Sequence, residues 1–306
     1  MILQRFQNEL EADFAEYLEQ VLGLRRGDGW EYEPEIVGAA KRPDFAIPRS
    51  AARPLLLDAK QFDPPSADAW RQETAGPRAF NPYAGARAKI DEGRRKFREF
   101  KGRFPCGVVL RSGALAEQCL DDPMMVFGSM LGSLGVQWPV DETGTAHPDR
   151  GGQAFLGGGR MIDGKRRTPQ NTTLGALLVL RRVPAYGRAL RMALARRPRD
   201  GRRSFEEIHA ITLRVAEELH RRGVTERPPI LGVRVHLNPF TSPPHQVAFP
   251  HEAFVGPVDE VWSYDVMHRE VRLEFRGAEL VRTDRVAMEV AQHMFGSAAP
   301  RSTGPV

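Results

Sequence analysis

The sequence contains few cysteines, few lysines and no long hydrophobic run. Its two cysteines among 306 residues provide neither a disulfide framework nor the ligand spacing of a zinc site, which is typical of a protein in a reducing cytoplasm. No segment reaches the length of a transmembrane helix, and the residues after Met1 lead straight into the first expected helix without a signal peptide. We therefore expect a cytoplasmic protein with no membrane partner.

Several recognisable functional motifs are also missing. The glycine-rich segment 155–160 lacks the lysine and the hydroxyl residue of a phosphate-binding loop, and no ATPase motif occurs elsewhere. The sequence contains no zinc finger and no clear helix-turn-helix, and its histidines match no metal-binding spacing. Any targeting or motor function would therefore belong to a separate subunit.

The charged residues are unevenly divided between the two basic types. The net charge is +5 and the sequence pI is near 9.5, which is compatible with an acidic polymer as partner without demanding one. Only six of the 44 basic residues are lysines, so this is an arginine-rich chain in which each lysine position is informative. High arginine, alanine and glycine content is equally explained by genomic base composition.

The most informative pattern joins two expected strands. Asp44 follows a proline and begins the first strand, while the apolar run 55–57 leads into Asp58 and Lys60 at the end of the second. Side chains alternate on a strand, so Asp58 and Lys60 point to the same face. A carboxylate beside a buried strand needs a partner, which indicates a metal, a cation or both.

This pattern resembles the motif of the PD-(D/E)xK nuclease superfamily. The resemblance implies that Asp44 and Asp58 bind a divalent metal, Mg²⁺ with Mn²⁺ as a substitute, and that Lys60 acts on the hydrolytic water. Mg²⁺ prefers oxygen ligands, and the carbonyl of Ala59 could complete the set. Gln61 is a further catalytic candidate because it follows directly. The alternative interpretation of the same residues is a structural turn followed by a surface salt bridge.

An amphipathic helix is expected before both strands, over residues 6–22. Its apolar residues recur at three- and four-residue steps: Leu10, Phe14, Leu18 and Val21. Nucleases of the resembled superfamily commonly contribute a further carboxylate from such a helix. The resemblance favours Glu11 as a catalytic and metal-binding residue, with Glu16 as second choice. A solvated acidic face is the other interpretation.

A second helix is expected over residues 83–101, followed by a buried strand at 106–110. Its exposed positions are basic and could contact a phosphate backbone, and the candidate nucleic-acid-binding residues are Arg87, Lys89, Arg94, Arg95 and Lys96. A merely solvated helix, partly balanced by its own acids, explains the same charges equally well.

The order of elements predicts an α/β fold. The resemblance implies a restriction-endonuclease-like mixed sheet flanked by helices. We assign residues 1–182 to a nuclease-like core with an insertion at about 113–170. Residues 183–306 are expected to form a basic C-terminal α+β extension that packs on or beside the core. Its basic run comprises Arg188, Arg191, Arg196, Arg197, Arg199, Arg202 and Arg203.

The resemblance implies a Mg²⁺-dependent endonuclease that hydrolyses phosphodiester bonds, with DNA favoured as the nucleic-acid partner. Restriction, repair and mobile-element defence are settings known for that superfamily. Cutting both strands of a duplex would favour a homodimer. The alternative is a non-catalytic nucleic-acid-binding or assembly subunit on the same fold. A third interpretation is an unrelated α/β enzyme in which Asp44 and Asp58 are structural.

Overall fold

The structure is a computed structural model that describes residues 6–49, 52–62, 81–112, 119–137, 139–147, 152–163, 168–195, 204–227, 229–241, 260–276 and 285–296. The chain divides into two compact units. The first comprises residues 1–181 and 233–276, and the second comprises residues 182–232 and 277–306. Of the predicted arginine run, Arg188 and Arg191 lie on a helix, and the part at 196–203 lies outside the described residues. None of the helices in the described ranges has the length and apolar character needed to cross a membrane.

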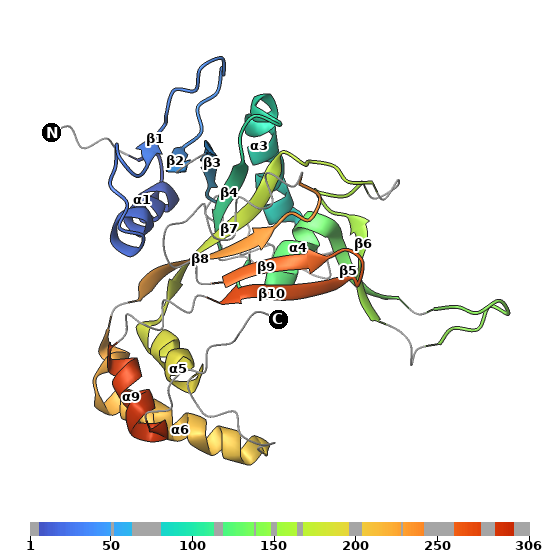
Figure 1. Cartoon of the computed structure of the whole chain (residues 1–306). Helices are drawn as coiled ribbons and strands as arrows, with labels where there is room; N and C mark the ends of the chain where they lie inside the picture. Colours follow the sequence, from blue (N-terminus) through green and yellow to red (C-terminus); the bar gives the residue numbers. More distant parts are fainter. Residues whose placement is uncertain are drawn as a thin grey trace, which may run out of the picture. The chain divides into compact units, whose positions relative to one another are not determined.

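The first unit is built on a mixed sheet of eight strands, as the α/β prediction requires (Figure 1). In spatial order the strands are β1 (Glu31–Tyr32), β2 (Phe45–Arg49), β3 (Ala52–Lys60), β4 (Cys106–Arg111), β7 (Leu174–Val183), β8 (Ile230–Leu237), β9 (Glu260–Asp265) and β10 (Glu270–Arg276). The pairs β3/β4, β4/β7 and β8/β9 are parallel, whereas β1/β2, β2/β3 and β9/β10 are antiparallel. Three strands of the predicted C-terminal extension thus belong to this same sheet.

The two faces of β3 bury different helices because its side chains alternate. On one face, Leu56 shares a hydrophobic cluster with Ile90 and Phe97 of helix α3 (Ala84–Phe97), which continues into the 3-10 turn η2 (Arg98–Phe100). On the other face, Leu57 pairs with Phe45, whose ring centroid lies 5.0 Å from that of Phe14. Helix α3 therefore covers the face that carries Leu56, Asp58 and Lys60.

Helix α3 approaches the sheet closely at a glycine. A Cβ atom added to Gly93 would lie 2.3 Å from Cγ2 of Val108, which is fully buried on β4. Only a residue without a side chain fits at this distance, so Gly93 sets how near the following turn of α3 comes to β3 and β4. Figure 1 shows α3 alongside these strands.

The N-terminal helix is shorter than the predicted segment 6–22. Helix α1 (Glu9–Glu16) begins after Asn8, whose side chain caps it by accepting from the Glu11 backbone N–H, and the last turn η1 (Tyr17–Val21) is π-helical. Leu10, Phe14 and Leu18 are fully buried, which confirms these three positions of the predicted apolar stripe, whereas Val21 is half-buried.

The predicted insertion contains a helix and a small sheet. Helix α4 (Pro123–Leu131) leads into β5 (Gly132–Gln137), which pairs antiparallel with β6 (Gly152–Gly158). Phe127 and Met130 of α4 belong to the same hydrophobic cluster as α3.

Apart from the last residues of β7 and the first of β8, the regular structure of the second unit is helical in its described residues. Helices α5 (Ala185–Ala195), α6 (Phe205–Arg221) and α9 (Arg285–Phe295) pack on one another and, with the 3-10 turn η5 (Val224–Glu226), enclose their own apolar cluster. A capping box begins α6 at Ser204, since the Ser204 side chain accepts from the Glu207 N–H and the Glu207 carboxylate accepts from the Ser204 N–H.

Candidate active site

The register of β2 and β3 brings the two predicted metal ligands together. Phe45 pairs with Leu57 and Ala46 with Leu56, so continuing the antiparallel register by one residue puts Asp44 opposite Asp58. Directly opposed residues on antiparallel strands share one face of the sheet. Asp44 therefore lies beside Asp58 although fourteen positions of sequence separate them.

Both carboxylates are removed from solvent and fixed in orientation. Asp58 is fully buried and Asp44 is 6% exposed. Oδ2 of Asp44 accepts a hydrogen bond of 2.7 Å from the backbone N–H of Ala59. This bond holds the loop before β2 against the end of β3 and leaves Oδ1 of Asp44 to interact with Lys96.

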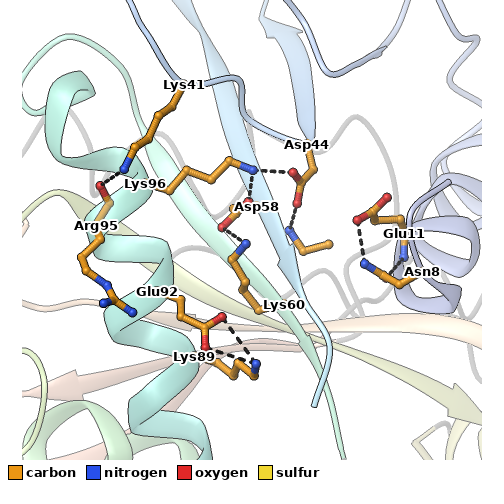
Figure 2. Close-up of polar contacts among 11 residues, drawn as sticks. Asn8, Glu11, Lys41, Asp44, Asp58, Lys60, Lys89, Glu92, Arg95 and Lys96 are labelled. Atoms are coloured by element: carbon orange, nitrogen blue, oxygen red, sulfur yellow. Dashed lines mark hydrogen bonds and ion pairs between the residues drawn. The ribbon is translucent and has the colours of Figure 1, made fainter. Parts of the chain in front are cut away.

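A lysine from helix α3 joins the two acids. Nζ of Lys96 donates to Oδ1 of Asp44 and to Oδ1 of Asp58, so one ammonium group bridges the pair (Figure 2). Oδ2 of Asp58 lies 2.8 Å from Nζ of Lys60, in an ion pair without the angle of a hydrogen bond. Two carboxylates thus face two ammonium groups.

The site has an unusual protonation balance. Burial, followed by the neighbouring charge of Asp58, raises the pKa of Asp44 to about 7, even though Lys96 opposes the shift. Burial lowers the pKa of Lys96, but the two carboxylates outweigh it and the net shift is upward. Lys96 therefore stays charged at neutral pH while Asp44 changes its protonation there.

The donor set fits a hard divalent cation. The Oδ1 atoms of Asp44 and Asp58 already converge on one positive group, and Oδ2 of Asp58 is buried without a hydrogen-bond partner in the described residues. Carboxylate oxygens are the ligands that Mg²⁺ and Mn²⁺ prefer. Across the described ranges no three His, Cys, Asp or Glu side chains group as a metal site, so backbone oxygen or water would have to complete the coordination.

Glu11 lies near the pair but is already hydrogen bonded. It is 2% exposed, and its carboxylate accepts from the backbone N–H of Gln7, from the Asn8 side chain and from the hydroxyl of Tyr32 at 2.6 Å. Burial, followed by its bond to Glu11, raises the pKa of Tyr32. Glu11 lines the same hollow as Asp44, whereas the second choice, Glu16, is exposed.

Gln61 also lines this hollow and ties two elements together. Its side-chain oxygen accepts from the backbone N–H of Leu10 at 3.3 Å, close to the start of α1. The contact positions α1 against the end of β3. Gln61 thus lies at the edge of the site with its oxygen directed at the helix.

The hollow in front of the carboxylates has a volume of about 470 Å³ and combines acidic, basic and amide side chains. Asp44, Lys60 and Lys96 line it together with Lys89 and Glu92 of α3. Nζ of Lys89 is 3.2 Å from the Glu92 carboxylate. A charged ligand entering this space would meet both ammonium groups and a carboxylate of the pair.

The five basic residues predicted to contact nucleic acid have different surroundings. Arg87 lies over the Tyr83 ring and donates to the Gly128 carbonyl, which ties α3 to α4. Lys89 pairs with Glu92, Arg94 donates to Asn171, and Lys96 bridges the acids. Arg95 is exposed, and its carbonyl accepts from Lys41.

The bridging position of Lys96 was not predicted; the sequence interpretation placed it on a phosphate backbone. The available signal was its spacing, because Lys96 follows Gly93 by three residues and both lie on the side of α3 that meets the sheet. A rare lysine one turn after a helix glycine indicates close contact with the facing strand.

Comparison with protein-family models, with curated proteins and with solved structures found no match to this chain.

Proposed function

We propose that this protein is a divalent-metal-dependent nuclease that hydrolyses phosphodiester bonds, with DNA as the favoured substrate. The observation that carries the proposal is the convergence of two buried carboxylates, Asp44 and Asp58, on a single cation position, with Lys60 2.8 Å from the second acid. Their hollow is large enough to admit a phosphate group.

The chemistry gives each residue a separate role. A divalent ion bound by Asp44 and Asp58 would neutralise phosphate oxygens and lower the pKa of a coordinated water. Lys60 would orient the attacking water and stabilise the charge that develops on the phosphate. Asp44 and Asp58 would hold the ion, and Lys96, which now donates to both, would have to release them first. Glu11 would act from the border of the hollow through water.

The proposal extends to the restriction-endonuclease-like fold and the PD-(D/E)xK superfamily. It is supported by an acid immediately before β2, an acid and a lysine at the end of β3, and a crossover through α3 to the parallel strand β4. The N-terminal helix α1 lies on the opposite face of β3 and brings Glu11 to the same hollow.

The test is cleavage of supercoiled plasmid and of single-stranded DNA in Mg²⁺ or Mn²⁺. We expect metal-dependent cleavage by the wild type, and a loss of at least a hundredfold in Asp58→Asn and in Lys60→Met. Glu270→Gln and Arg272→Met, which change exposed side chains of β10, serve as matched controls and should cleave normally. Equal cleavage by Asp58→Asn and Glu270→Gln would refute the proposal.

A second candidate is a non-catalytic nucleic-acid-binding or assembly subunit. The ion pairs of Lys96 favour it, because its ammonium already balances the two carboxylates that a metal would need. This candidate predicts salt-dependent DNA binding without cleavage in any divalent metal. It also predicts that Asp58→Asn lowers stability and leaves DNA binding unchanged.

A further inference from the structure

A second hollow beside the site is lined by basic and neutral polar side chains. It has a volume of about 280 Å³, and the residues around it are Arg94, Arg95, Arg98, Lys101, Asn171, Thr172 and Thr173. The four basic residues come from the end of α3, from η2 and from the residue after it, and the other three directly precede β7. No carboxylate is among these lining residues. The hollow is therefore suited to an anion.

The basic residues of this hollow are gathered closely. Arg94, Arg98 and Lys101 are spaced four and three residues apart, so they lie along one side, where like charges repel one another. Cations near a helix C-terminus interact favourably with the helix dipole, which offsets part of the repulsion. The dipole explains their presence on the helix, but it does not explain a hollow closed by Asn171 and two threonines.

Part of the hollow is held in place before any ligand binds. The Asn171 side-chain oxygen accepts from Arg94 at 3.0 Å, and the Asn171 amide donates to the Arg160 carbonyl. Asn171 adopts a left-handed backbone conformation with φ of 57°, which turns the chain toward α3 just before β7. Arg95, Arg98 and Lys101 are exposed, and within the described ranges no acidic side chain forms an ion pair with them.

The hollow shares lining residues with the space around the two acids. Arg95 lines both it and a neighbouring hollow of about 590 Å³, which Lys60, Lys96 and Glu92 also line. Lys60 and Lys96 in turn line the hollow with Asp44. Figure 2 shows Arg95 and Lys41 on one side of Lys96, and Asp44 with Glu11 on the other. Basic side chains of α3 and of the residues after it thus line neighbouring hollows from Lys96, beside the carboxylates, to Lys101.

We propose that this hollow binds a phosphate of the nucleic-acid backbone other than the one that is cleaved. The inference rests on the proposed function and adds a positioning contact to it. Arginine binds phosphate oxygens through paired N–H groups, and threonine hydroxyls are common additional donors to phosphate. A second phosphate held at Arg98 and Lys101 would fix the strand while its scissile phosphate meets Lys60.

The test compares two variants that lose the same charge. Arg98→Gln/Lys101→Gln removes two cations of the hollow, and Arg269→Gln/Arg272→Gln removes two from the β9–β10 turn region. Fluorescence anisotropy with a labelled 20-mer duplex in EDTA gives the Kd over a series of salt concentrations. We expect the first variant to bind about tenfold more weakly. For this variant the slope of the logarithm of the binding constant against the logarithm of the salt concentration should be smaller in magnitude by about 0.9, the value for one lost phosphate contact. The control should match wild type.

Separate readouts distinguish the two proposals. Equal Kd values and salt slopes in the two variants would overturn the phosphate site even if the protein cleaves DNA. Weaker binding by the hollow variant, in a protein that cleaves nothing, would leave the phosphate site standing and refute the nuclease. If wild type fails to bind the duplex but inorganic phosphate raises its Tm and not that of the variant, the hollow is a small-anion site and the strand assignment is wrong.

Discussion

Replacing Lys96 by methionine should make the protein depend on a divalent metal for its stability. The substitution keeps most of the side-chain volume and removes the ammonium between Asp44 and Asp58. At pH 8 the two buried carboxylates would then face each other with only Lys60 nearby, 2.8 Å from Asp58. Breaking a buried ion pair in this way costs about 3–5 kcal/mol.

We expect the lower end of this range, about 3 kcal/mol, because Lys60 remains and the Lys96 side chain is 20% exposed. At about 2.1 cal/mol/K of unfolding entropy per residue, this loss corresponds in a chain of 306 residues to a fall in Tm of about 5 °C. Mg²⁺ at a hundredfold excess over its Kd would return about 2.7 kcal/mol. Wild type should gain less, since the metal must first displace Lys96.

Thermal unfolding followed by circular dichroism, in EDTA and in Mg²⁺ at pH 8, tests this reasoning. Lys101→Met is the matched control, because Lys101 is exposed and removed from the two acids. The double variant Asp44→Asn/Lys96→Met removes one charge of each sign and should recover most of the stability in EDTA. A Lys96→Met protein as stable as the control, or one that Mg²⁺ stabilises no more than wild type, would refute the account.

Three further predictions follow from the same contacts. The pKa of Asp44 in the folded protein is raised to about 7, so the folded protein holds this proton more tightly than the unfolded chain. The protonated carboxyl therefore contributes at most about 4 kcal/mol to the free energy of unfolding at pH 4, and this contribution is lost as the pH rises through 7. Urea unfolding in EDTA should therefore show stability falling from pH 5 to pH 8 in wild type and a smaller fall in Asp44→Asn; equal falls would contradict this. Gly93→Ala should lower the free energy of unfolding by about 1–3 kcal/mol, because its Cβ would overlap Val108, and an unchanged urea midpoint would show that α3 can move away. Ser204→Ala should cost about 1 kcal/mol by removing the cap of α6, detectable as faster amide hydrogen exchange in that helix, whereas Ser204→Asp should exchange like wild type.

The strands and helices around the site were predictable because their signals are local. The apolar run before Asp58 and the stripe of α1 are periodic patterns that burial imposes on a strand and on a helix. Local information also predicts that Asp44 and Asp58 lie opposite each other, since two strands joined by a short connection pair antiparallel in most proteins. The capping box at Ser204 is a signal of the same local kind, because it involves only the four residues 204–207.

The contacts that cross between elements were not predictable from the sequence. Lys96 meets Asp58 only because Gly93 lets α3 approach β4, and this distance depends on the packing of several strands. The hydrogen bond from Tyr32 to Glu11 likewise depends on how β1 lies beside α1. Strands β8 to β10 were expected in a separate extension, because sequence order alone does not reveal that they continue the first sheet.

Direct measurement of metal binding tests the central claim, that Asp44 and Asp58 form a divalent-metal site. Mn²⁺ can be titrated into EDTA-treated protein and followed by electron paramagnetic resonance of the free ion. The account predicts saturable binding to wild type, tighter binding to Lys96→Met, and loss of binding in Asp58→Asn. Absence of binding to both wild type and Lys96→Met, or equal binding by Asp58→Asn, would contradict it.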